Sequence, residues 1–234
     1  VTLNEGTVLN AEKASGLYSY YRGATLNGVT INADAENSYG AYIYGPGTVN
    51  IKNGTTINTP GCSSYGMYYT ANNVTTNFED STVNSGNIGV HMSTNTDTKK
   101  FNMKSGTIIG KTYGIRINQS NSTLTLGVDG SELSTTNPYV EGGIYSIYQT
   151  AGTMNFYSGL LKGYSSAYNG TFNNIRAEHT IYEDFEETEA YLIKNKTYTT
   201  TEISSEPIEN TAKEGNGYAK LTYIENSLIE DNEE

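Results

Sequence analysis

The chain has 234 residues, only 35% of which belong to the hydrophobic set, with 25 Gly, 21 Tyr, 5 Phe and no Trp. Its formal net charge of -11 argues against binding to the phosphate backbone of nucleic acids. No run of residues approaches the ~18 apolar residues of a membrane span, so we expect no membrane insertion within this segment. The single cysteine, Cys62, excludes an internal disulfide, and we expect it to be a small packed residue.

A five-residue pattern recurs along the chain, most clearly as Tyr-Gly-Ile-Arg-Ile at residues 113–117. The position that holds Gly114 in this copy recurs at residues 16, 40, 66, 89, 114, 143 and 166. A repeat of about 25 residues is typical of solenoids, in which each repeat is one turn that must stack on its neighbours to bury its apolar side.

Each repeat contains three short strand candidates joined by polar turns. The first alternates apolar and polar residues, which predicts a strand with one buried face. The second follows a turn that often contains glycine, and the Tyr-Gly pattern forms the third. The residues expected to point inward from the first strand are Val49, Ile51, Phe101, Met103, Leu124, Leu126, Met154 and Phe156. No stretch shows helical periodicity. The pattern therefore predicts an all-β, right-handed parallel β-helix whose turns stack about 4.8 Å apart.

The repeats predict three regions. Residues 1–172 should form about seven turns, with insertions at residues 93–98 and 128–138. Residues 173–224 should form degenerate coils or capping β-strands, because the end of a solenoid exposes unpaired backbone. Residues 225–234 are expected to be a polar tail or linker. Strands in the second region are expected at residues 180–182, 190–193, 197–201 and 218–224.

Several segments resemble the repeats of large cell-surface proteins of Gram-positive gut bacteria, of the adhesin type, in the pectate-lyase-like β-helix class. The segments that carry this resemblance are residues 105–110 (Ser-Gly-Thr-Ile-Ile-Gly), 113–115, 124–127, 152–159 and 217–223. The resemblance covers about three quarters of the chain. It implies a location outside the cell, on the bacterial surface. Since such helices serve as adhesins, stalks and glycan-active enzymes, it implies architecture more specifically than activity.

The position two residues after the repeat glycine is the candidate binding site. Because side chains alternate along a strand, it should point outward while the preceding apolar residue, such as Ile115 or Ile144, points inward. Seven stacked side chains would form a strip about 29 Å long. The candidate binding residues are Tyr18, Tyr42, Tyr68, His91, Arg116, Tyr145 and Tyr168.

This strip allows two interpretations. Tyrosine rings stack on sugars, and Arg116 with His91 could add selectivity for polar or anionic ligands. Alternatively, the stacked rings only stabilise the solenoid, since cross-strand aromatic pairs contribute about 0.2–1 kcal/mol each. A second column, with Lys52, Glu79 and Lys104 on adjacent turns, is expected to select register on an exposed face.

An enzyme on this scaffold would need clustered carboxylates, as glycosidases and calcium-dependent lyases do. The candidates are Glu79, Asp80, Asp97, Asp129 and Glu132, with Arg116 or Lys111 as a base, and they do not recur in one column. No sequence motif indicates a nucleotide, zinc or calcium site, so we expect no cofactor and no metal.

The sequence therefore favours a non-catalytic extracellular module, an adhesin or stalk, that presents a tyrosine-rich strip to a glycan or to a protein on a host or neighbouring cell. One alternative is a structural subunit that self-associates through its solenoid ends into a head-to-tail filament. Another is a polysaccharide lyase or glycoside hydrolase.

Overall fold

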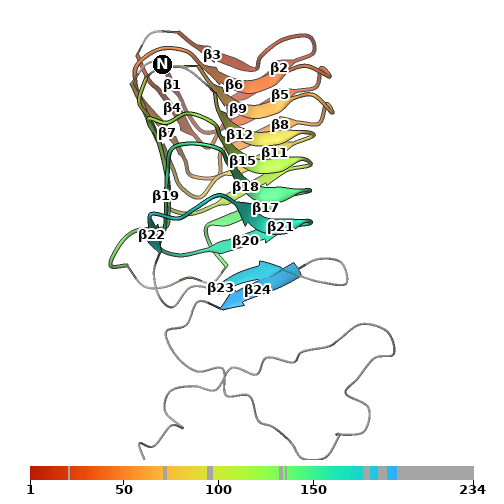
Figure 1. The fold of residues 1–234 in the computed structure, drawn as a ribbon. Helices are drawn as coiled ribbons and strands as arrows, with labels where there is room; N and C mark the ends of the chain where they lie inside the picture. The colour runs from red at the N-terminus through yellow and green to blue at the C-terminus, as the bar shows by residue number, and fades with distance from the viewer. Residues whose placement is uncertain are drawn as a thin grey trace, which may run out of the picture. The chain divides into compact units, whose positions relative to one another are not determined.

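A computed structural model of the protein describes residues 1–174, except residues 21, 71–72, 94–96, 132–133 and 135, and the backbone of residues 175, 180–183 and 189–193. These residues form no helix, and hence none that could span a membrane. The chain winds through three sheets in a repeating order, so that each strand pairs with the equivalent strand of the next turn (Figure 1). The predicted parallel β-solenoid is confirmed.

The first sheet, here sheet A, contains the first strand of each turn. Its order is β1 (Thr2–Leu3), β4 (Ala24–Asn27), β7 (Gly47–Lys52), β10 (Val74–Phe78), β13 (Lys99–Met103), β16 (Ser122–Leu126), β19 (Thr153–Phe156) and β22 (Asn174–Ile175). All eight residues predicted to point inward from this sheet are buried, because apolar residues at alternate positions share one face.

The second sheet, sheet B, contains the second strand of each turn, which follows the first after a short connection. Its order is β2 (Val8–Ala11), β5 (Thr30–Ala33), β8 (Thr56–Thr59), β11 (Thr82–Ser85), β14 (Thr107–Gly110), β17 (Tyr139–Gly142), β20 (Leu160–Gly163), β23 (Thr180–Glu183) and β24 (Glu189–Ile193). Only the last pair, β23 and β24, is antiparallel. The insertion predicted at residues 128–138 lies in the connection from β16 to β17.

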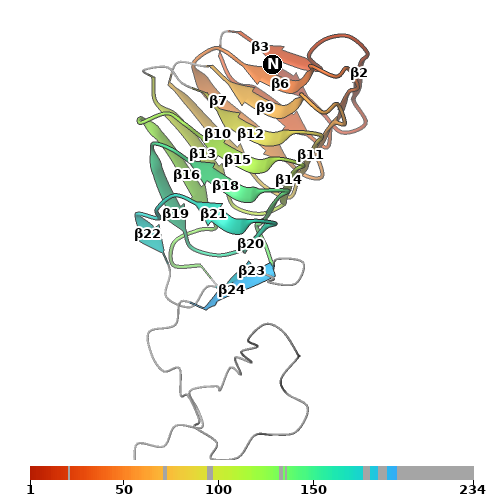
Figure 2. The ribbon, with the colours of Figure 1, turned by 45° about the vertical axis from the view of Figure 1, so that its right-hand side comes forward.

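The third sheet, sheet C, contains the recurring Tyr-Gly pattern. Its order is β3 (Leu17–Ser19), β6 (Tyr39–Ile43), β9 (Tyr65–Tyr69), β12 (Ile88–Met92), β15 (Tyr113–Ile117), β18 (Tyr145–Gln149) and β21 (Ser166–Asn169). The seven strands match the predicted seven turns, and Figure 2 shows the strands of successive turns stacked along the solenoid. The insertion predicted at residues 93–98 lies between β12 and β13.

The core is narrow because it consists of columns that run through successive turns. In sheet B, for example, Ile57 is in register with Val83, and Val83 with Ile108, and all three side chains are 0% exposed. Such columns explain how a chain with few hydrophobic residues can bury a continuous core, because each turn supplies only one to three apolar side chains per sheet.

Side-chain amides connect the outer faces of sheets A and B from turn to turn. In sheet B, Asn84 donates to Asn58, Asn58 to Asn32, and Asn32 to Asn10, over 3.2, 2.9 and 2.8 Å between Nδ2 and Oδ1. Equivalent amide bonds in sheet A join Asn102 to Asn77, Asn77 to Asn50, and Asn174 to Asn155. Asn ladders of this kind favour an in-register parallel stack.

The C-terminal region agrees with the sequence where it is described. The strands predicted at residues 180–182 and 190–193 are present as β23 and β24. Those predicted at 197–201 and 218–224, and the tail at 225–234, lie outside the described residues. The chain divides into two compact units, Val1–Asn195 and Lys196–Glu234.

Candidate functional site

The outer face of sheet C carries two columns of side chains, where the sequence predicted one. In strands such as β6, β9 and β15, the first and fourth residues lie on the outer face and the second, third and fifth are buried. The second residue is glycine: a Cβ on Gly66 would lie 2.2 Å from Val83 Cγ1 and 2.5 Å from the Gly89 carbonyl oxygen. Two consecutive positions therefore face inward, and simple alternation fails here.

The fourth position is the predicted column, and the register confirms part of it. Tyr18 is in register with Tyr42, and Tyr42 with Tyr68. His91 is in register with both Tyr68 and Arg116. The other column, at the first position, was not predicted from the sequence, although a tyrosine precedes the repeat glycine at Gly40, Gly66 and Gly114. It holds Tyr39, Tyr65, Ile88, Tyr113 and Tyr145.

The assignment of Tyr145 to the predicted column is wrong. Arg116 is in register with Tyr148, and Tyr145 is in register with Tyr113 in the first column. The predicted column takes Gly143 as the repeat glycine, but Gly143 lies in the turn before β18. Ile144, which was expected to point inward, is 37% exposed. Ser146 takes the crowded position that glycine holds in the preceding turns.

Tyr168 does not belong to the outer strip either. Tyr168 is in register with Ile147, which belongs to a column that faces the core. Buried Ala167, the residue before Tyr168, occupies the position that glycine holds in other turns. The ring centroid of Tyr168 lies 4.6 Å from that of Phe172, and both side chains pack against the core cluster. We therefore assign Tyr168 to the packing of the last turn.

Rings in the first turns contact one another along the solenoid. The Tyr18 and Tyr42 rings are stacked with centroids 4.8 Å apart and planes 7° apart, and Tyr20 stacks on Tyr44 in the same way. Much of each ring face is therefore covered by the next ring. Burial and the neighbouring phenols raise the pKa of Tyr18 and of Tyr39, which keeps both hydroxyl groups protonated at neutral pH.

The two columns also pack against each other. Tyr39 contacts Tyr42 edge to face at 5.1 Å between ring centroids, and Tyr65 lies 5.1 Å from Tyr68. The hydroxyl group of Tyr68 donates to Ser93 Oγ over 3.1 Å. These contacts combine the tyrosines of β3, β6 and β9 into one aromatic surface, and they support both a stabilising and a binding role.

The middle of the strip is less aromatic. At β12 the two outer positions hold Ile88 and His91, which are only 3% and 6% exposed. His91 Nε2 lies 3.3 Å from Asn118 Oδ1. Burial, and then the charge of Arg116, lowers the pKa of His91 to about 4, so its ring is neutral at pH 7.

A second aromatic group follows at β15 and β18. The Tyr113 ring is stacked with those of Tyr145 and Tyr148, at centroid distances of 6.1 and 4.8 Å. The guanidinium carbon of Arg116 lies 5.8 Å from the centroid of Tyr148, which is within range of a cation–π interaction. Sheet C therefore presents tyrosines on both sides of a central Ile–His–Arg group.

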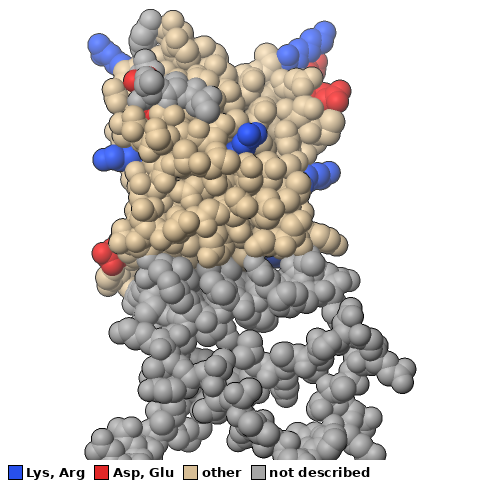
Figure 3. Space-filling model, viewed as in Figure 1, with Lys and Arg blue, Asp and Glu red and all other residues tan. Residues whose placement is uncertain are grey.

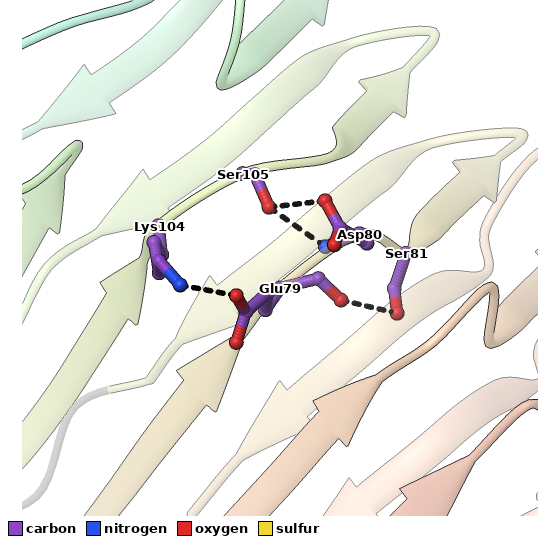
Figure 4. Close-up of polar contacts among 5 residues, drawn as sticks. All are labelled: Glu79, Asp80, Ser81, Lys104 and Ser105. Atoms are coloured by element: carbon purple, nitrogen blue, oxygen red, sulfur yellow. Dashed lines mark hydrogen bonds and ion pairs between the residues drawn. The ribbon is translucent and has the colours of Figure 1, made fainter. Parts of the chain in front are cut away.

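The carboxylates considered for catalysis lie on other parts of the fold. Glu79 forms an ion pair with Lys104, and Asp80 accepts a hydrogen bond from Ser105 at 2.6 Å, at the connection from sheet A to sheet B (Figure 4). Asp97 precedes β13 and Asp129 follows β16. Glu132 lies outside the described residues, and Arg116 projects from sheet C.

The charged column predicted from Lys52, Glu79 and Lys104 is confirmed in part. The ion pair joins Glu79 to Lys104 on the next turn, and both side chains are exposed, so solvent and salt weaken it. Over one side of the solenoid, charged side chains of the described residues gather mainly at the edges, with one basic group near the middle (Figure 3).

The remaining candidates add no site. Among the described residues, no group of three or more His, Cys, Asp and Glu side chains could hold a metal ion. Cys62 is exposed rather than packed, and its Sγ lies 3.1 Å from Glu36 Oε1. A comparison with protein-family models, with curated proteins and with solved structures finds no match for this chain.

Proposed function

We propose that this β-solenoid is a non-catalytic module of a bacterial cell-surface protein, an adhesin or stalk, and that the outer face of sheet C binds a glycan or a surface protein. The observation that carries this proposal is the clustering of tyrosine rings on this face, in one group at β3, β6 and β9 and in another at β15 and β18. Tyrosine rings from successive turns contact one another, and none of the seven strands contains Asp or Glu. Such a surface suits recognition better than hydrolysis, which requires placed carboxylates.

A glycan is the ligand that this surface chemistry favours. Stacking between turns covers ring faces, while Tyr18, Tyr20 and Tyr44 remain 54%, 42% and 39% exposed. Phenol groups both donate and accept hydrogen bonds, as sugar hydroxyl groups do, and ring edges contact the apolar C–H groups of sugars. A chain of sugars can contact equivalent side chains on several turns, so weak contacts add up along the strip.

The proposal is tested with a glycan array and a triple variant, Tyr42→Ser, Tyr68→Ser and Tyr148→Ser. We expect the wild type to bind a subset of glycans, and the triple variant to lose this binding while it still unfolds cooperatively. Tyr164→Ser is the matched control, because Tyr164 is 62% exposed but lies in the turn before β21.

Two results would contradict the proposal. One is a triple variant that is much less stable but binds as the wild type does, since the tyrosines would then only stabilise the stack. The other is the release of unsaturated or reducing sugars when polysaccharides are incubated with the protein, with or without Ca²⁺, which would favour the lyase or hydrolase alternative.

A further inference from the structure

Arg116 is the only charged residue in the seven strands of sheet C. The other residues of β3, β6, β9, β12, β15, β18 and β21 are Tyr, Gly, Ser, Ala, Ile, Leu, Met, Val, His, Gln and Asn. On a surface otherwise made of aromatic and neutral side chains, one cation stands out, because a charge that contacts apolar rings loses part of its hydration.

Among the described residues, no negatively charged side chain pairs with Arg116, and its buried Nε has no hydrogen-bond partner. The residue in register on one side is His91, which is neutral, and on the other side it is Tyr148, whose ring faces the guanidinium group. Neither neighbour supplies a negative charge.

The fold also sets the background charge around this site. Residues 1–175 carry nine Lys and Arg against ten Asp and Glu, a formal charge of -1, whereas residues 176–234 carry five against fifteen, a formal charge of -10. The acidity of the chain therefore belongs almost entirely to its C-terminal quarter. Sheet C thus belongs to the nearly neutral part of the sequence, and Arg116 places a cation in the middle of its strip.

We propose that the outer face of sheet C binds a sugar chain that carries anionic groups, and that Arg116 receives one carboxylate or sulfate while the flanking tyrosines contact the neighbouring sugars. The planar guanidinium fork matches the paired oxygens of these groups, and stacking on Tyr148 holds it in place. Tyr68 lies two turns before Arg116 in the same column, and Tyr113 lies in the same strand as Arg116, in the first column. This inference rests on the function proposed above and adds the class of ligand.

The experiment measures binding by isothermal titration calorimetry to three oligosaccharides of similar length: one of uronic acids, one sulfated and one neutral. We expect the full chain to prefer one or both acidic oligosaccharides over the neutral one, and to lose this preference as NaCl is raised. Arg116→Gln should lower the affinity for the acidic ligand about tenfold or more, since it removes charge-assisted hydrogen bonds. Its affinity for the neutral ligand should fall much less, because that ligand has no anionic group for the guanidinium to bind.

Two further variants separate the role of Arg116 from that of positive charge in general. Arg116→Lys keeps the charge but loses the fork, so it should restore binding only in part. Lys100→Gln is the matched control, because it removes one positive charge from an exposed residue in β13 of sheet A. Preference for the uronic or for the sulfated ligand identifies the source of the anionic group.

The outcomes distinguish this inference from the function on which it rests. Binding of neutral and acidic oligosaccharides with equal affinity, or an Arg116→Gln variant with unchanged preference, would overturn the inference and leave glycan binding intact. The absence of binding to any glycan would overturn both. Binding of an acidic peptide in place of the acidic sugars would replace the glycan with a protein partner.

Discussion

The side-chain Nδ2 of Asn58 donates to the side-chain Oδ1 of Asn32 on the preceding turn, and its Oδ1 accepts from Asn84 Nδ2 on the following turn. Asn32 and Asn58, the inner amides of this ladder, thus each donate toward one turn and accept from the next. The three residues Asn32, Asn58 and Asn84 lie in register on adjacent strands. These bonds can form only when equivalent positions lie opposite each other, so they favour the observed alignment of the turns.

Replacement of Asn58 with alanine should therefore destabilise the stack. The change removes two hydrogen bonds on a partly buried face, and we expect a loss of about 1–2 kcal/mol in the free energy of unfolding. Urea denaturation followed by circular dichroism measures it. A variant as stable as the wild type would show that water replaces the ladder without cost.

The equivalent ladder in sheet A is interrupted, which predicts a stabilising change. Thr125 stands between Asn102 and Asn155, and Asn155 donates to its hydroxyl group over 3.3 Å. Thr125→Asn would continue the amide series on both sides, and we expect a gain of about 0.5–1 kcal/mol in the same denaturation experiment. Thr123→Asn, two residues earlier in the same strand, is the control that changes the same residue type outside the ladder. A variant less stable than the wild type would contradict the prediction.

The sequence predicted the sheets well and the outer face of sheet C only in part, for a physical reason. Sheets A and B follow strict alternation, so the pattern of Val49 and Ile51 indicates the buried face directly. In sheet C the glycine lets two successive residues face inward, which alternation alone does not indicate. The copy with Ser146 in place of glycine then shifted the alignment, and Tyr145 was placed where Tyr148 lies. Two residues separate Gly110, at the end of β14, from Tyr113, and two separate Gly142, at the end of β17, from Tyr145. This constant spacing between sheets B and C would have been a better guide.

The glycines of sheet C should resist substitution by residues with a side chain. Gly66→Ala would place its Cβ against Val83 and the backbone of Gly89, neither of which can move away without opening the next turn. We expect a loss of about 1–3 kcal/mol in stability, as for other overpacked positions. Ser146→Ala at the equivalent position is the control, because that site already accommodates a Cβ and loses only the hydrogen bond to the Ala167 carbonyl. Equal melting temperatures for Gly66→Ala and the wild type would contradict the crowding.

Cys62 should react as an accessible thiol in the folded protein. It is exposed in the connection between β8 and β9 and has no packing role. We expect a maleimide reagent to label it in buffer about as fast as in urea, and Cys62→Ser to leave the melting temperature unchanged. Labelling that requires urea would show that the thiol is covered in solution.

Stability should depend on pH through His91. Burial beside Arg116 lowers its pKa from 6.5 to about 4, so the unfolded chain takes up a proton at a higher pH than the folded chain does. The free energy of unfolding therefore has its full value above pH 6.5 and decreases by about 2–3 kcal/mol as the pH falls toward 4. His91→Phe keeps a ring at this position and removes the proton site. We expect the difference in unfolding free energy between the wild type and this variant to shift in favour of the variant between pH 7 and pH 4. Parallel curves for the two proteins would show that His91 titrates normally in the folded state, and an NMR titration of its ring would then give a pKa close to 6.5.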